Sequence, residues 1–140
     1  MDTEIKIMNG EIAVDDRGTV SFVNDFDFEG VRRFYQLSNH DINYIRAWHG
    51  HMKEGKYVYV SKGSALVGVV NLGTEEIKKF VLSDKSPKIL WIPPGNANGF
   101  MNLEQDTRIL FFSTSTLEES LSDDVRFDYD KWDIWDKNYR

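Results

Sequence analysis

Two short segments of the chain carry side chains that could transfer protons. The first contains His49 and His51 and leads to Lys56, and the second contains Asn98. An imidazole titrates near neutral pH and can act as an acid or a base. A lysine repels a metal cation, and a neutral amide is a poor ligand for a transition metal. Two histidines and a lysine in one pocket would therefore suit proton transfer better than metal binding.

The segments around these residues have the composition of short β-strands separated by turns. Glycine, proline, asparagine and aspartate mark the turns, as in residues 93–95 (Pro-Pro-Gly). Strands that recur every 8 to 12 residues or so with such turns are typical of a β-sandwich or barrel. The expected strands, all rich in β-branched and aromatic residues, are 19–23, 32–37, 44–48, 56–60, 65–71, 78–82, 88–92 and 107–113.

One short helix and a packed C-terminal segment complete the expected elements. Residues 115–121 begin with a serine and a threonine that could cap a helix, and two glutamates follow in its first turn. Residues 128–140 alternate acidic and aromatic side chains. We expect this segment to pack against the rest of the protein.

Composition and charge limit the class of protein. The 140 residues, 41% of them hydrophobic, suffice for one globular domain over residues 1–140. A net charge of −6 disfavours nonspecific nucleic-acid binding, although local arginines could still bind phosphate. No apolar run reaches the roughly 20 residues of a membrane span, a signal peptide is not evident, and cysteine is absent. These features predict a cytoplasmic protein without a membrane or nucleic-acid partner.

The spacing of the two segments resembles the two signature motifs of the cupin superfamily. The general cupin pattern has a glutamate where this chain has Lys56 and a further histidine where it has Asn98, and those residues supply metal ligands. The resemblance implies an all-β fold, a cupin-type jelly-roll β-barrel with a short C-terminal helix and a packed tail. The two replacements favour a pocket without a metal.

Four stretches, in chain order, resemble the dTDP-4-dehydrorhamnose 3,5-epimerase family of deoxysugar biosynthesis. Residues 16–18 resemble its Asp-x-Arg-Gly turn, and residues 34–49 its Gln-x-Asn-x-Ser and Leu-Arg-Gly-Leu-His segments. Residues 90–100 nearly match its Phe-Trp-Ile-Pro-x-Gly-Phe-Ala-His-Gly-Phe, and residues 124–135 resemble its closing segment. The His-x-His pair also resembles the related dTDP-4-keto-6-deoxyhexose 3,4-ketoisomerases.

The resemblance implies that a proton is removed from a carbon next to the C4 ketone of a nucleotide-linked sugar. His49 matches the position of the family's base, and Asp128 matches the carboxylate that orients the base, with Asp130 as an alternative. Lys56 matches the lysine that would stabilise the enolate oxygen. His51 would contact substrate, serve as a second base or have a structural role.

Further residues are implied to bind the substrate. Arg46 resembles the arginine that binds the diphosphate, and Arg17 resembles one that reaches the nucleotide from the neighbouring subunit of a dimer. A guanidinium suits a diphosphate because it can bond as a bidentate fork. Gln36, Asn98 and Tyr57 complete the expected substrate-binding set. The expected partners are thus a dTDP- or GDP-linked sugar and a second copy of the chain, in a homodimer.

One position departs from the epimerases in a way that affects the reaction. The family carries a tyrosine that reprotonates the enolate on the opposite face, and the matching stretch here contains Phe111, which cannot donate a proton. Three alternatives follow: a single epimerisation with water, Tyr57 or Tyr59 as the acid; a ketoisomerase-like proton shuttle; or binding without activity. A metal-dependent cupin that uses His49 and His51 is a further alternative.

The resulting hypothesis is a metal-independent, cofactor-free epimerase. It would act at the 3- and/or 5-position of a nucleotide-linked 4-keto-(6-deoxy) sugar in surface-polysaccharide biosynthesis. A 3,4-ketoisomerase of the same substrate class and a noncatalytic sugar-nucleotide-binding cupin remain the alternatives.

Overall fold

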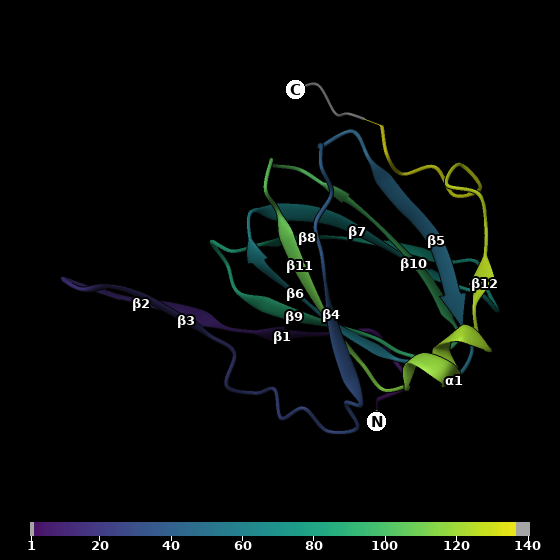
Figure 1. Cartoon of the computed structure of the whole chain (residues 1–140), viewed down its shortest axis with the longest axis horizontal. Helices are drawn as coiled ribbons and strands as arrows, with labels where there is room; N and C mark the ends of the chain where they lie inside the picture. The colour runs from purple at the N-terminus through teal and green to yellow at the C-terminus, as the bar shows by residue number, and fades with distance from the viewer. Residues whose placement is uncertain (1, 137–140) are drawn as a thin grey trace.

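The computed structural model describes residues 2–136, which form two five-stranded antiparallel sheets, a separate hairpin and one short helix (Figure 1). The first sheet has the order β1 (Lys6–Asn9), β9 (Lys88–Ile92), β6 (Lys56–Lys62), β11 (Arg108–Ser113) and β4 (Arg33–Leu37). The second has the order β12 (Val125–Arg126), β5 (Ile45–His51), β10 (Asn96–Asn102), β7 (Ser64–Asn71) and β8 (Ile77–Ser83).

The main hydrophobic core lies between the two sheets. Successive side chains of a strand point to opposite faces, so every second residue of each sheet faces the other sheet. Val58, Leu90 and Phe111 of the first sheet pack in one cluster with Val67 and Phe100 of the second. Burial of each of these side chains contributes about 1.5–3 kcal/mol. The expected all-β class is confirmed.

A two-stranded hairpin projects from the body of the molecule (Figure 1). Its strands are β2 (Glu11–Asp15) and β3 (Gly18–Phe22), which pair with each other. Val14 and Val20 are largely exposed on it. The turn at its tip contains Arg17, whose guanidinium bonds to the carboxylate of Asp15.

The helix is shorter than its sequence predicted and has the expected cap. It is α1 (Leu117–Leu121), and Thr116 is its N-cap. The Thr116 hydroxyl accepts a bond from the Glu119 backbone N–H at 3.2 Å, while the Glu119 carboxylate accepts one from the Thr116 N–H at 3.0 Å. This reciprocal capping box satisfies two backbone donors that a helix start leaves unpaired. The helix therefore begins at a defined residue beside the end of β5.

The C-terminal segment packs on the outer face of the second sheet. Trp48 of β5 contacts Trp132 and Trp135, and the indole N–H groups of Trp48 and Trp135 both donate to the Tyr129 carbonyl. Gly68 leaves room for these rings, because an added Cβ would lie 2.5 Å from the Trp48 ring. The expected packed tail is confirmed through residue 136, and its last four residues, 137–140, lie outside the described residues. Within residues 2–136 no helix is long and apolar enough to cross a membrane.

Candidate active site

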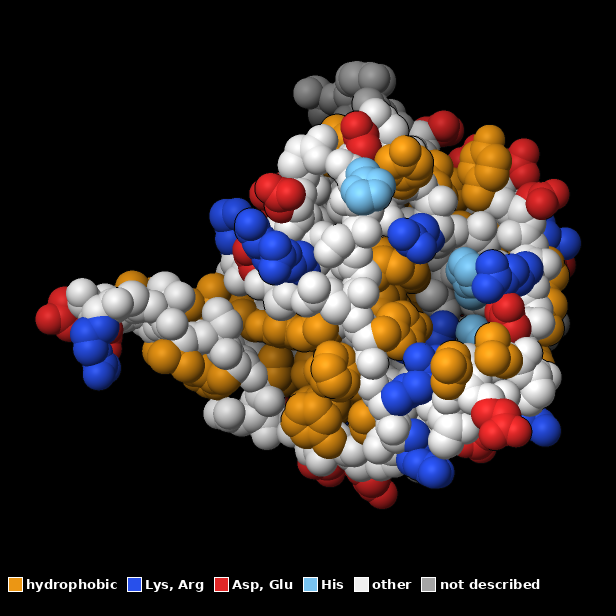
Figure 2. Space-filling model, in the orientation of Figure 1, with side chains coloured by type: hydrophobic (Ala, Val, Ile, Leu, Met, Phe, Trp, Pro, Cys, Tyr) orange, Lys and Arg blue, Asp and Glu red, His pale blue; other side chains and the backbone are white. Residues whose placement is uncertain are grey.

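A cavity of about 200 Å³ opens at the end of the molecule where α1 and β12 meet the two sheets. Figure 2 shows histidine, basic and apolar side chains gathered on this part of the body, away from the projecting hairpin. Both sheets contribute to the cavity. The lining residues are Tyr35, Leu37, Arg46, His49, His51, Lys56, Asn98, Phe100, Ser120, Leu121, Asp124 and Arg126.

A bulge in β5 places Arg46 on the same side as the two histidines. Simple alternation would point Arg46 away from the face that carries His49 and His51. However, Asn98 pairs with His49 whereas Phe100 pairs with Arg46, so β5 contains one extra residue against β10. Such a bulge re-aims the side chains on one side of it. Arg46 therefore lines the cavity, and its Nε donates to the Oδ1 of Asn39 at 2.6 Å.

His49 lies beside two positive charges and is held neutral. It pairs in register with Asn98 on one side and with Arg126 on the other. Burial, together with the charges of Arg126 and Lys56, lowers the pKa of His49 to about 4, while the charge of Asp124 acts in the opposite direction. At neutral pH the imidazole is thus unprotonated and can accept a proton.

Lys56 lines the cavity and is almost completely buried. Its Nζ donates to the Oδ1 of Asn98 at 3.2 Å, and burial lowers its pKa while the charge of Glu54 opposes that change. An ammonium and an amide at these positions are unsuitable as ligands for a transition metal. Residues 2–136 also contain no cluster of three or more His, Cys, Asp or Glu side chains arranged to hold a metal ion. The donor set therefore does not fit a metal.

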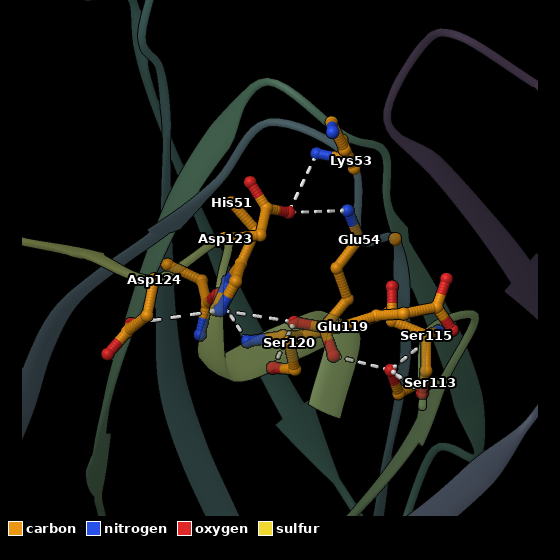
Figure 3. A network of polar contacts seen from close by, with 12 residues as sticks. His51, Lys53, Glu54, Ser113, Ser115, Glu119, Ser120, Asp123 and Asp124 are labelled. Carbon is orange, nitrogen blue, oxygen red and sulfur yellow. Dashed lines mark hydrogen bonds and ion pairs between the residues drawn. The ribbon is translucent and has the colours of Figure 1, made fainter. Parts of the chain in front are cut away.

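His51 belongs to a buried polar network that the sequence did not predict (Figure 3). Its Nε2 lies 3.1 Å from Oε2 of Glu54 and 3.8 Å from Oδ1 of Asp124. Glu54 follows β5 in the turn before β6, and its side chain has no exposed area. Nothing in the sequence marks Glu54, because its partners Ser113 and Ser120 are remote in the chain.

Among the described residues, the tyrosine that lines the cavity is Tyr35. It comes from β4 in the first sheet, opposite the histidines of the second sheet. Its ring stacks on Phe111 with centroids 4.8 Å apart and planes inclined by 10°. Burial raises the pKa of Tyr35, with a further contribution from the charge of Glu54, so its hydroxyl stays protonated at neutral pH.

The comparison with known protein families identifies the fold and the general class. A family model described as dTDP-4-dehydrorhamnose 3,5-epimerase matches residues 3–137. The chain belongs to this family. Among curated proteins no significant match is found.

Solved structures of the epimerases and of related ketoisomerases share this fold. The epimerase from Bacillus anthracis, with TDP and PPi bound, has a TM-score of 0.81 at 18% identity. The match covers 98% of this chain and 87% of that epimerase. The epimerase from Sulfolobus tokodaii has a TM-score of 0.79 at 24% identity, with coverages of 95% and 82%. The 3,4-ketoisomerase QdtA from Thermoanaerobacterium thermosaccharolyticum, in complex with TDP, has a TM-score of 0.73 at 21% identity, with coverages of 93% and 92%. The cupin-type jelly roll predicted from the sequence is confirmed.

Five of the residues that the epimerase resemblance singled out come together in the cavity. Arg46, His49 and His51 come from β5, Lys56 comes from β6, and Asn98 comes from β10. The cavity is also lined by three residues that the sequence had not assigned to the site, namely Tyr35, Asp124 and Arg126.

Asp128 lies outside the cavity, although it matched the orienting carboxylate of the family. β12 pairs with β5 through Arg126 and His49, and the backbones of Phe127 and Trp48 bond to each other one residue further on. The chain then turns away, and Asp128 is exposed, with its carbonyl accepting a bond from the Lys131 N–H. Asp124 is the carboxylate that lines the cavity.

Three other expected substrate-binding residues also lie away from the cavity. Gln36 faces outward because its neighbours in β4, Tyr35 and Leu37, face inward. Tyr57 faces away from Lys56 and packs against the Trp91 ring at a centroid distance of 4.5 Å. Arg17 is exposed at the tip of the projecting hairpin, so it could contact a nucleotide only in another copy of the chain.

Proposed function

We propose that this protein is a metal-independent epimerase of a dTDP-linked 4-keto-6-deoxy sugar. Its reaction is the removal and return of a proton on a carbon next to the ketone. The observation that carries the proposal is the convergence of neutral His49 and buried Lys56 in one cavity that also holds Arg46. A base, a donor for the ketone oxygen and a group for the diphosphate are the three functions that substrate binding and proton removal need.

His49 acts as the base in this scheme. A proton leaves the carbon next to the ketone for the imidazole, and the electron pair moves onto the ketone oxygen as an enolate. The Lys56 Nζ donates to that oxygen, and positive charge aimed at a developing oxyanion is commonly the largest single catalytic contribution. Asp124, whose charge acts on His49, stabilises the imidazolium in the role that the sequence suggested for Asp128.

Inversion of a carbon requires a proton donor on the opposite face of the sugar. The histidines come from the second sheet, and Tyr35 comes from the first sheet across the cavity. Tyr35 thus supplies the hydroxyl that Phe111 lacks. In this scheme Tyr35 donates its proton to the carbon, and the proton held by His49 returns to the tyrosinate through solvent, so that no net proton is gained or lost.

A 3,4-ketoisomerase is the second candidate, and a specific feature of the cavity favours it. His49 and His51 lie two residues apart on one face of β5 and line the same cavity. Two proton carriers on one side of the sugar would suit this reaction. One proton moves from C3 to C4, and a second moves from the C3 hydroxyl to the C4 oxygen.

We further propose that two arginines bind the nucleotide. Arg46 in the cavity binds the diphosphate by charge-assisted bonds. Arg17, at the tip of the hairpin, binds the nucleotide in the neighbouring subunit of a homodimer. The hairpin that carries Arg17 projects away from the body of the molecule (Figure 1), which leaves its tip free to contact a second copy.

The test is incubation of the protein with dTDP-4-keto-6-deoxyglucose in D2O, followed by mass spectrometry and proton NMR of the product. An epimerase gives deuterium at C3 or C5 with inverted configuration. A ketoisomerase gives a 3-keto sugar with a new C4 hydrogen. Binding of dTDP by calorimetry, with neither deuterium uptake nor formation of a 3-keto product, would refute both proposals and leave a binding protein.

Matched variants show which residues carry the reaction. We expect His49→Asn to abolish deuterium uptake and the exposed His40→Asn to retain it. Tyr35→Phe should allow deuterium uptake while slowing the formation of the inverted product, and Tyr129→Phe should change neither. Inversion at the wild-type rate in Tyr35→Phe would show that another group is the acid.

A further inference from the structure

Glu54 is a carboxylate held entirely inside the protein, beneath the cavity. The Ser113 hydroxyl and the Arg33 guanidinium contact its Oε1, and the Ser120 hydroxyl donates to its Oε2 at 3.1 Å. The Nε2 of His51 lies 3.1 Å from that same Oε2 (Figure 3). A buried carboxylate is tolerated when donors surround it in this way. Glu54 is therefore the ionised acceptor at the centre of the network.

The backbone around Glu54 is also fixed. The carboxylate of Asp123 accepts bonds from the N–H groups of Met52, Lys53 and Glu54 at 2.9, 2.8 and 3.0 Å. These bonds tie the turn between β5 and β6 to the segment between α1 and β12. Glu54 thus has little freedom to move away from His51.

This arrangement determines which nitrogen of His51 carries the proton. An ionised carboxylate can only accept, so a ring nitrogen at 3.1 Å from it must carry hydrogen to avoid repulsion between lone pairs. Nε2 is therefore the protonated nitrogen in neutral His51. The other nitrogen, Nδ1, is buried without a hydrogen-bond partner among the described residues. It belongs to a ring that lines the cavity, and it has a free lone pair.

We propose that Glu54 is a positioning residue that makes His51 a second proton acceptor of the cavity, acting through Nδ1. The proton taken from a substrate hydroxyl or carbon binds to Nδ1, and the resulting imidazolium donates from Nε2 to Glu54. The same proton later returns to the substrate, so the histidine is unchanged at the end. The catalytic part of this inference rests on the proposed function, whereas the tautomer of His51 does not.

The other charges around His51 come from three segments. Burial and the charge of Lys56 on β6 lower the pKa of His51, while the charges of Glu54, Asp124 and Asp123 raise it. His49 is its neighbour on β5 and is neutral at pH 7. Replacing Glu54 by glutamine removes the first of the opposing charges with little change in shape, so the pKa of His51 should fall further.

The first test measures the tautomer by long-range proton–nitrogen NMR of the ¹⁵N-labelled protein without ligand at pH 7. The chain has three histidines, so the His49→Asn and His51→Asn variants assign the signals. We expect His51 to show a protonated Nε2 and an unprotonated Nδ1. A protonated Nδ1 with a bare Nε2 would overturn the proposal.

The second test compares Glu54→Gln with the wild type. We expect deuterium uptake from D2O to slow by about 10- to 100-fold, part of the roughly 10²- to 10⁴-fold that acid–base catalysis contributes. The acid limb of the rate profile should move to lower pH, and the affinity for dTDP should be unchanged. A merely structural role predicts an unchanged pH profile, and Glu54→Asp, which keeps the charge, should restore part of the rate.

A third variant covers the outcome in which Glu54→Gln does not fold. Ser120→Ala removes one donor to Glu54 and should shift the pH profile in the opposite direction, because a less satisfied carboxylate holds the His51 proton more strongly. An unchanged profile in Ser120→Ala would contradict the proposal. If the wild type takes up no deuterium, the proposed function fails while the tautomer of His51 is still decided by NMR.

Discussion

Acidification from pH 7 to pH 5 should weaken folding of the wild type more than folding of the His49→Asn variant. The pKa of His49 is lowered from its ordinary 6.5 to about 4. Between these values the unfolded chain binds a proton that the folded protein excludes, so the free energy of unfolding falls as the pH falls. The neutral His49 therefore contributes its full stabilisation above about pH 6.5, and this stabilisation is lost as the pH falls towards 4.

The size of the effect follows from the two pKa values. Their difference of 2.5 corresponds to about 3.4 kcal/mol once both states are protonated, and to about 2 kcal/mol at pH 5. His49 is only half-buried, and solvent screening reduces such values. We therefore expect a loss of about 1 kcal/mol at pH 5 that the variant does not show.

Urea unfolding followed by tryptophan fluorescence measures this loss, because Trp48 and Trp91 are buried in the folded protein. Both proteins are unfolded at pH 7 and at pH 5, and the change with pH in the variant is subtracted from that in the wild type. Contributions from titratable groups that do not interact with His49 are common to both proteins and cancel. An equal loss of stability in the two proteins would refute the assignment of a neutral, desolvated His49.

Three further predictions concern the enolate site, the tail and the hairpin. Lys56→Met should slow deuterium uptake by about 10²- to 10³-fold, the usual effect of losing an oxyanion donor, while calorimetry shows little change in dTDP affinity. Gly99→Ala should destabilise the protein by about 1–3 kcal/mol, because the new Cβ would lie 2.6 Å from Ala47 Cβ and 3.1 Å from the Trp135 ring. Gly73→Ala, which would meet only Asn71 Oδ1 at 3.2 Å, should cost less. Urea unfolding of both variants measures the two losses of stability. Arg17→Ala should leave the urea midpoint unchanged and weaken dTDP binding, and equal affinity in both proteins would exclude a role for the hairpin in the nucleotide site.

The sequence predicted strands where the side chains themselves favour them. β6 and β11 are rich in β-branched and aromatic residues, and β7 is rich in valine and other apolar residues. The predicted bounds of these three strands agree with the structure to within two residues. β10 was missed because its three asparagines and its glycine have low strand propensity. That strand forms because β5 and β7 pair with it on both sides, which is a tertiary effect that no local pattern reveals.

The sequence predicted those site residues that fall within the family motifs. His49, Lys56 and Arg46 matched family positions, and they do line one cavity. The choice of Asp124 over Asp128 depends on the register of β12 and on where the chain turns after it. Glu54 gave no signal because the serines that hold its carboxylate, Ser113 and Ser120, are 59 and 66 residues away in the sequence.

The proposed function rests on the removal by His49 of a proton next to the ketone of a dTDP-linked sugar. Its most direct test is the rate of deuterium uptake into dTDP-4-keto-6-deoxyglucose in D2O, measured by mass spectrometry for the wild type, for His49→Asn and without protein. Calorimetry with dTDP first establishes that both proteins bind the nucleotide. We predict uptake in the wild type that is at least about 100-fold faster than in His49→Asn. Equal rates in the two proteins, or a wild-type rate no higher than that without protein, would contradict this proposal.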